Sequence, residues 1–309
     1  MRVLICGAGA MGCLFGGYLS LAGEEVWLLS HWLEHIERIR REGLLLHALA
    51  GAPLSIRIPI LSYDDPLPGK IDVAFISVKS HDTPEAAAQA ARALAPTGVA
   101  ITMQNGIGNH ELLMAAVGEK RALLGVTSHG ATLLGPGEVR HAGVGPTHIA
   151  AEPDPAAAAR IARLLTRAGF ASQVEAEIEP VIWGKLLINV GINALTALLG
   201  VRNGVLAEHE DAEAGLRAAV EEAAAVARAK GIPIPDKPAD RALAVARATS
   251  GNVSSMLADV RREVPTEIDV INGAIVREGA AHGIPTPANE ILTHLVHLLE
   301  QTYEQRVGN

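Results

Sequence analysis

Residues 1–12 read MRVLICGAGAMG, a short apolar run that leads directly into a glycine-rich motif. This order predicts a buried strand over 2–7, a tight turn, and a helix over 10–22. In a dinucleotide-binding unit the first glycine permits the turn, the second lets a pyrophosphate approach, and the third lets helix and strand pack closely. A plain strand–turn–helix would also use glycines, but here the motif opens a β-α series. The residues expected to bind a dinucleotide are Gly7, Gly9, Ala10, Met11 and Gly12.

The first half of the chain continues this alternation of strands and helices. Near-continuous apolar runs are typical of parallel strands that are covered on both faces. A doubly wound, Rossmann-like parallel sheet is therefore expected. Strands are predicted over 25–29, 71–79 and 98–105 and hairpin-like strands within 125–148, with helices over 32–42, 83–95 and 155–168.

The pattern changes to helices alone near residue 178, which predicts a second, all-α domain. We place a dinucleotide-binding domain at 1–174 and a helical substrate and dimerisation domain at 175–309. A cleft between two such domains is the default ligand site, and a homodimer is a reasonable expectation for the second domain. Helices are predicted over 178–199, 207–230, 236–250, 252–262, 265–282 and 287–305.

Composition narrows the class of protein. The 309 residues are 49% hydrophobic and 19% charged, with a net charge of −8 and no basic tract, which counts against nucleic acid as a partner. The chain begins directly with a strand, and Cys6 and Cys13 have no metal-ligand spacing. A cytoplasmic protein in a reducing compartment, with no metal site, is expected. The apolar helix 178–199 carries a lysine and two asparagines, which argues against a membrane span.

The end of the second predicted strand indicates which dinucleotide binds. NAD-binding proteins usually place Asp or Glu there, where the carboxylate accepts a hydrogen bond from the ribose 2′-hydroxyl. This chain has Ser30 and His31 instead, within the sequence WLLSHW. The missing carboxylate removes repulsion against a 2′-phosphate, and both side chains can donate to one, although no arginine is present for the usual bidentate contact. NADP is therefore favoured over NAD.

Two polar residues follow strands of the predicted sheet. Lys79 closes the run FISVK, and Asn105 closes ITMQNG. Ligands of doubly wound sheets bind at the carboxyl ends of strands, so both are candidate ligand contacts. Each also has an ordinary explanation, since Lys79 could be a solvated surface charge and Asn105 a turn residue before Gly106.

The apolar helix WGKLLINVGINALTALLG (183–200) carries Lys185, Asn189 and Asn193 at positions i, i+4 and i+8. This spacing puts the three side chains on one stripe of the helix. A lysine that reaches solvent and asparagines that bridge helices would explain them structurally. Asparagine is nevertheless poor in helix interiors and buried amides need partners, so the stripe is interpreted as a wall facing a polar ligand.

A fourth candidate segment lies at 251–276. Asn252 and Ser255 have the i, i+3 spacing of a helix start, and Ser255 could simply be a cap or a buried hydroxyl. Glu267 is predicted in the first turn of a helix, where a carboxylate also interacts well with the helix dipole.

Taken together, these motifs resemble the ketopantoate reductases (2-dehydropantoate 2-reductases) over nearly the whole chain. The matching blocks are GAGAMG, VKSHD, QNGIG, the lysine–asparagine helix, NVSSMLAD and TEIDVINGAIV…HGIPTPAN. The chain departs from the family's pattern at His31, where members that use NADP commonly have arginine. The resemblance implies that Lys79 and Asn105 line the nicotinamide and substrate region, that Asn189, Asn193, Asn252 and Ser255 hold the pantoate skeleton, and that Lys185 is the general acid with Glu267 as its partner.

These residues suit reduction of a 2-oxo acid. A positioned ammonium stabilises the charge that develops on a ketone oxygen and then gives up a proton. Burial should lower the pKa of Lys185, while a neighbouring Glu267 should oppose that shift. The expected function is NADPH-dependent reduction of 2-dehydropantoate to pantoate, toward pantothenate and coenzyme A. The alternatives are reduction of another branched 2-oxo acid and a non-catalytic NADP(H)-binding regulator.

Overall fold

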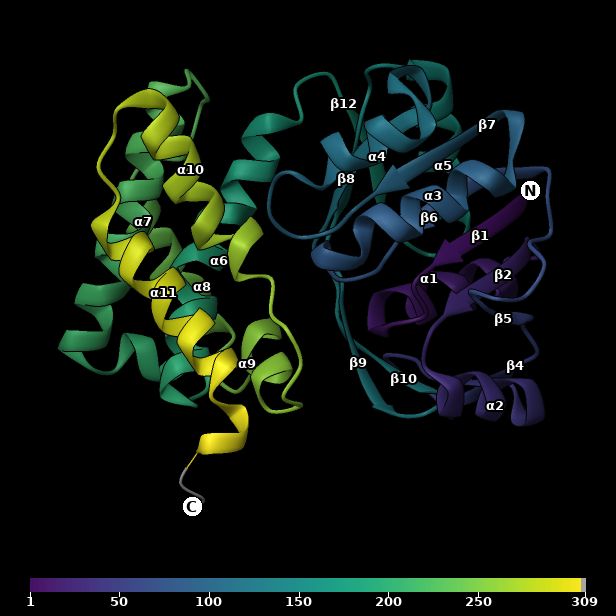
Figure 1. Cartoon of the computed structure of the whole chain (residues 1–309), viewed down its shortest axis with the longest axis horizontal. Helices are drawn as coiled ribbons and strands as arrows, with labels where there is room; N and C mark the ends of the chain where they lie inside the picture. Colours follow the sequence, from purple (N-terminus) through teal and green to yellow (C-terminus); the bar gives the residue numbers. More distant parts are fainter. Residues whose placement is uncertain (307–309) are drawn as a thin grey trace. The chain divides into compact units, whose positions relative to one another are not determined.

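The computed structural model of the chain describes residues 1–306, which fold into two compact units (Figure 1). The first unit contains Met1–Gln104 and Asn109–Ile178, and the second contains Asn105–Gly108 and the chain from Glu179 onward. The sequence suggested a single boundary between residues 174 and 175. The second unit instead begins at residue 179 and includes a short segment from the middle of the first.

The first unit is built on an eight-stranded sheet of order β12-β11-β8-β7-β6-β1-β2-β5. All neighbouring strands pair in parallel except β11 and β8, which are antiparallel. The strand order reverses between β1 and β6, which is the point where doubly wound sheets bind ligands. The expected Rossmann-like sheet is confirmed. Its strands are β1 (Arg2–Cys6), β2 (Glu25–Ser30), β5 (Ile60–Ser62), β6 (Ile71–Ile76), β7 (Leu94–Thr102), β8 (Ala122–Thr127), β11 (Thr147–Ala150) and β12 (Ser172–Glu175).

Helices cover both faces of this sheet, as Figure 1 shows for the first unit. One buried cluster joins the sheet to α1 and α5 and includes Phe15, Phe75 and Phe170. The cluster on the other face joins the sheet to alanines of α3 and to Leu113 of α4. Because apolar side chains pack on both faces, most residues of the central strands β1 and β6 are buried, as their sequences predict. The helices are α1 (Ala10–Leu21), α2 (Leu33–Glu42), α3 (Thr83–Ala93), α4 (Asn109–Val117) and α5 (Pro155–Arg167).

A second, four-stranded sheet of order β4-β3-β10-β9 was not predicted. The strands β9 (Gly130–Gly135) and β10 (Glu138–Gly143) form the hairpin expected within 125–148. The other two strands, β3 (Leu44–His47) and β4 (Leu54–Ile56), are too short to give a clear sequence pattern. β3 pairs with β10 in parallel, Leu45 opposite Glu138, so the sheet depends on a contact between distant parts of the chain.

The second unit is helical, with α6 at its centre, packed against α7, α8, α9 and α11. Among the described residues, α6 is the one helix long and apolar enough to cross a membrane, but 61% of its most apolar window is buried within the protein. That burial is typical of the core helix of a globular unit. The helices are α6 (Glu179–Leu199), α7 (Glu210–Ala229), α8 (Pro238–Ala248), α9 (Ser255–Val260), α10 (Asn272–His282) and α11 (Pro287–Gln301).

A buried histidine ties α2 to the turn between β9 and β10. His35 is fully buried, and its Nδ1 accepts a hydrogen bond from the backbone N–H of Gly137 at 3.0 Å. The proton of the neutral ring therefore lies on Nε2, which is 3.4 Å from the Sγ of Cys13. Burial lowers the pKa of His35 to about 4. The folded protein thus holds this ring neutral well below the pH at which an exposed histidine gains its proton.

The first unit should consequently lose stability in mild acid. Because the folded-state pKa of His35 lies below its unfolded value of about 6.5, the unfolded chain binds more protons between those pH values. The free energy of unfolding should fall by about 3 kcal/mol as the pH is lowered from 6.5 to 4. Urea unfolding measured across this range gives the dependence of the free energy of unfolding on pH. A His35→Gln variant should lose much of that dependence. The same slope in His35→Gln and in the exposed control His294→Gln would contradict this assignment.

Candidate active site

The glycine motif has the geometry of a dinucleotide-binding turn. Gly7 has a φ of +106°, and a Cβ there would lie 2.7 Å from the backbone that follows β6. A Cβ on Gly12 would lie 1.9 Å from the carbonyl oxygen of Gly7, so only glycine lets α1 pack this closely against β1. A Cβ on Gly9 would meet one described atom within 4 Å, and no side chain caps the start of α1. The free helix N-terminus and open face at Gly9 therefore fit a pyrophosphate.

Ser30 and His31 lie at the carboxyl end of β2, as expected, but their surroundings differ from the expectation. The Ser30 Oγ accepts a hydrogen bond from the backbone N–H of Trp32. The His31 ring stacks on Tyr63 with 3.6 Å between ring centroids, and its Nε2 lies 3.1 Å from the carboxylate of Glu85. β2 itself does not end in an acidic residue, but Glu85 in the first turn of α3 places a carboxylate at the same position.

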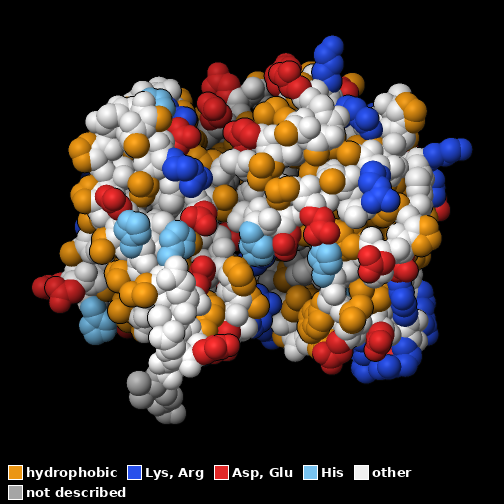
Figure 2. All heavy atoms as spheres, in the orientation of Figure 1, with side chains coloured by type: hydrophobic (Ala, Val, Ile, Leu, Met, Phe, Trp, Pro, Cys, Tyr) orange, Lys and Arg blue, Asp and Glu red, His pale blue; other side chains and the backbone are white. Residues whose placement is uncertain are grey.

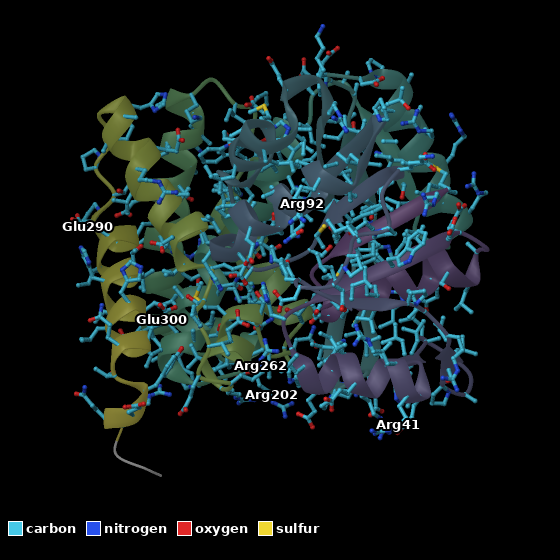
Figure 3. All side chains as sticks on the ribbon, turned by 45° about the vertical axis from the view of Figure 1, so that its right-hand side comes forward. Arg41, Arg92, Arg202, Arg262, Glu290 and Glu300 are labelled. Carbon is cyan, nitrogen blue, oxygen red and sulfur yellow. The ribbon has the colours of Figure 1, made fainter. Side chains whose placement is uncertain are left out.

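The basic side chains on α2 are already paired. Figure 2 shows blue side chains gathered over this helix, which carries Arg38, Arg40 and Arg41. Arg38 and Arg41 form ion pairs with Glu42, and Arg40 forms one with Asp65. Arg41, labelled in Figure 3, lies at the outer end of the helix. Among the described residues, Glu85 is the charged side chain that contacts the His31 ring directly, through its carboxylate.

Lys79 and Asn105 do not close strands, which corrects the sequence-based placement. β6 ends at Ile76, and Lys79 immediately precedes a short 3₁₀ turn at Ser80–Asp82 in the first unit. β7 ends at Thr102, and Asn105 belongs to the second unit.

The turn that follows Asn105 is hydrogen-bonded to the rest of the second unit. The backbone N–H of Ile107 donates to the carbonyl of Val270 at 3.0 Å. Gly106 has a φ of +79°, and a Cβ there would lie 2.2 Å from that same carbonyl oxygen. Glycine is therefore required at position 106 by this close backbone approach, and the side chain of Asn105 lies beside Glu267.

Lys185, Glu267 and Asn105 form a polar cluster within the second unit. The Nδ2 of Asn105 donates to Glu267 Oε2 at 3.4 Å, and Glu267 is only 6% exposed. Burial lowers the pKa of Lys185 to about 8, and the negative charge of Glu267 opposes that shift. Both effects were expected from the sequence, and the structure shows that burial is the larger. The ammonium therefore exchanges its proton much closer to neutral pH than an exposed lysine does.

Glu267 does not lie in the first turn of a helix, so that prediction is wrong. It precedes a 3₁₀ turn at Ile268–Val270, and α10 begins only at Asn272. The break lies at Ile271, whose φ of −108° and ψ of −94° are not helical. The adjoining backbone is held by α11, because Glu300, labelled in Figure 3, accepts a hydrogen bond from the N–H of Thr266. The carboxylate is thus positioned by a fixed loop rather than by a helix start.

The polar stripe on α6 is confirmed as a helical feature. Asn193 is 5% exposed, while Lys185 and Asn189 are half-buried. About one turn after Asn193, the hydroxyl of Thr196 lies 2.7 Å from that of Ser254. The stripe therefore ends at a hydrogen bond that ties α6 to the start of α9.

Ser254, not Ser255, is the cap of α9, and its Oγ accepts a hydrogen bond from the N–H of Leu257. This leaves Ser255 and Asn252 exposed on either side of the cap. The backbone of Asn252 is fixed, because its carbonyl accepts from the N–H of Asn203. Both side chains remain available to a ligand. Sequence reasoning missed Ser254 and Thr196, although the two consecutive serines in NVSSM were a signal that one would serve as a cap.

The chain matches the models of one protein family over most of its length. The family model "Ketopantoate reductase PanE/ApbA" matches residues 3–154, and the model of the same family's C-terminal part matches 177–300. A 2-dehydropantoate 2-reductase of Halobacterium salinarum is 37% identical over 97% of this chain and 99% of its own. One of Archaeoglobus fulgidus is 35% identical over 97% of this chain and 98% of its own.

Solved structures share the fold over almost the full length. A PanE/ApbA family ketopantoate reductase of Ralstonia eutropha superposes with a TM-score of 0.90 at 35% identity, covering 98% of this chain and 100% of its own. A D-mandelate dehydrogenase with NADH and anilino(oxo)acetate has a TM-score of 0.91 at 28% identity, covering 98% and 99%. The chain belongs to the ketopantoate reductase family, and it is an oxidoreductase that acts on a CH–OH group with a pyridine nucleotide.

Proposed function

We propose that the protein reduces 2-dehydropantoate to pantoate with NADPH, a step toward pantothenate and coenzyme A. The observation that carries the proposal is the pairing of the half-buried Lys185 with the buried Glu267, beside Asn105. The names of the relatives support the choice of substrate. A homodimer in the cytoplasm, expected from the sequence, forms part of the same proposal.

The first unit would hold the cofactor. Gly7, Gly9 and Gly12 and the N-terminus of α1 would bind the pyrophosphate, through Ala10 and Met11 in its first turn. Ser30 and His31 would meet the adenosine ribose, and Lys79 would lie toward the nicotinamide. Bound NADPH supplies the hydride that reduces the keto carbon.

The second unit would bind the keto acid and supply the proton. As the keto carbon is reduced, negative charge grows on its oxygen, and the Nζ of Lys185 would stabilise that charge and then protonate the oxygen. A pKa near 8 suits this role, because the group stays charged at neutral pH yet releases a proton readily. Glu267 would keep the ammonium charged before the reaction. Asn189 and Asn193 would bind the hydroxyl or keto oxygen, and Asn252 and Ser255 the carboxylate.

A second candidate function is reduction of a different keto acid by the same site residues. Its support is the likeness to a D-mandelate dehydrogenase whose structure contains NADH and anilino(oxo)acetate. Such an enzyme would reduce another branched or aryl-substituted 2-oxo acid. The glycine motif, Lys185 and Glu267 would have the same roles in both reactions.

Oxidation of NADPH with a panel of 2-oxo acids tests the proposal. The panel should contain 2-dehydropantoate, smaller branched 2-oxo acids and phenylglyoxylate. We expect the highest kcat/KM for 2-dehydropantoate, by about tenfold or more, which corresponds to about 1.4 kcal/mol of transition-state stabilisation. A higher kcat/KM for another acid would favour the second candidate. Tight NADPH binding without oxidation by any acid would instead indicate a non-catalytic regulator.

A further inference from the structure

Three side chains from distant parts of the first unit meet at the carboxyl end of β2. His31 follows β2, Tyr63 follows β5, and Glu85 lies in the first turn of α3. The His31 ring lies between the other two, stacked on Tyr63 and 3.1 Å from the Glu85 carboxylate. The hydroxyl oxygen of Tyr63 is buried and has no hydrogen-bond partner among the residues described. The cluster therefore has a polar group that its own side chains leave unsatisfied.

The topology puts this cluster where the adenosine ribose of a bound dinucleotide would lie. β6, β1 and β2 are adjacent in the sheet, and all three run in the same direction. The glycine turn follows β1, so a pyrophosphate bound there extends its adenosine toward the end of β2. Glu85 comes from the helix after β6, and its contact with His31 brings a carboxylate to the end of β2. NAD-binding proteins use a carboxylate at this same place to bind the ribose 2′-hydroxyl.

The charge of Glu85 has opposite consequences for the two cofactors. A 2′-phosphate carries a charge of about −1.5 to −2 at neutral pH, and it would approach a carboxylate already paired with the one histidine that follows β2. The side chains of His31 and Glu85 are 54% and 53% exposed, so solvent screens this repulsion without removing it. A 2′-hydroxyl, in contrast, can donate a hydrogen bond to the carboxylate.

We propose that Glu85 is the residue that sets the choice between NADH and NADPH. It accepts a hydrogen bond from the 2′-hydroxyl of NADH, repels the 2′-phosphate of NADPH, and offsets the contribution of His31 to phosphate binding. The inference rests on the proposed dinucleotide site and assigns its specificity. The Glu85 charge should accordingly reduce the preference of the wild-type protein for NADPH, and loss of that charge should shift the preference toward NADPH.

The test compares two small fragments of the cofactors. Binding of 2′,5′-ADP and 5′-AMP is measured by isothermal titration calorimetry with the wild-type chain and with Glu85→Gln. In Glu85→Gln, 2′,5′-ADP should bind about tenfold more tightly, or about 1.4 kcal/mol, and 5′-AMP equally or less tightly. Because no keto acid is present, failure of the proposed reduction would not affect this result. The ratio of kcat/KM for NADPH and NADH should change in the same direction.

Glu111→Gln is the matched control. Glu111 is the third residue of α4, as Glu85 is the third residue of α3, and both are exposed acids in a first helical turn. Glu111→Gln should leave both affinities unchanged. An unchanged affinity ratio in Glu85→Gln would overturn the proposal. Weaker binding of 2′,5′-ADP would also overturn it, because Glu85 would then promote phosphate binding, by holding the His31 ring in place.

Discussion

Lys185→Ala should lower kcat for reduction of 2-dehydropantoate by about 10²–10⁴-fold while the protein still binds NADPH. Loss of a general acid typically costs that much, and loss of the positive charge at the developing alkoxide adds to it. Lys185 has no proposed contact with the glycine motif, which would bind the pyrophosphate, so cofactor affinity should stay within about twofold. Steady-state kinetics and fluorescence titration with NADPH measure the two quantities.

The control for Lys185→Ala must separate lost chemistry from lost folding. Removal of the lysine takes a neighbouring positive charge away from the buried carboxylate of Glu267, which can cost several kcal/mol of stability. The double variant Lys185→Met/Glu267→Gln removes both charges and should fold, yet remain as slow as Lys185→Ala. Lys230→Ala is the matched control, because Lys230 also pairs with a glutamate, Glu278, in the same unit. Near wild-type kcat in the double variant would show that Lys185 is not the acid.

Asn193→Ala should raise the KM for the keto acid about 10- to 100-fold and leave NADPH affinity unchanged. Asn193 is 5% exposed on the stripe that begins at Lys185, and a hydrogen bond to a charged ligand contributes about 1.5–3 kcal/mol. Ser255→Ala should have an effect of the same kind, since Ser255 is exposed at the start of α9. Initial-rate kinetics with varied keto acid measure both variants.

The matched control for these variants is Thr293→Val. Thr293 is also a buried polar side chain of the second unit, bonded to the carbonyl of Asn289 within α11. It should lower thermal stability without changing KM. If Asn193→Ala and Ser255→Ala also lowered only stability, their side chains would be structural. Their assignment as substrate-binding residues would then be wrong.

Features with a local cause were predictable from the sequence. The glycine motif requires only a tight turn and a close helix–strand contact, and the structure has both. The stripe of Lys185, Asn189 and Asn193 follows from helical periodicity alone. The lowered pKa of Lys185 was also predictable, because an apolar helix implies burial. The opposing effect of Glu267, which is distant in the sequence, was expected only from the family resemblance.

Features that depend on contacts between distant residues were not predictable. The pairing of His31 with Glu85 spans 54 positions, and no periodicity in the sequence reports it. Asn105 joins the second unit through a backbone contact with Val270, although its own sequence indicates only a turn. Glu267 precedes an interrupted helix because Ile271 leaves the helical conformation, and isoleucine gives no warning of such a break.

The central claim is that Lys185 donates the proton and that Glu267 keeps it charged. The pH dependence of kcat for wild type and Glu267→Gln tests this most directly, with Glu278→Gln as the matched control. In wild type, reduction should slow as the pH rises through about 8, because Lys185 loses its proton there. In Glu267→Gln the midpoint should move to lower pH, and a shift of one unit would equal about 1.4 kcal/mol of lost interaction, shared by the coupled pair. An equal loss of rate at every pH, with the midpoint unmoved, would contradict the account.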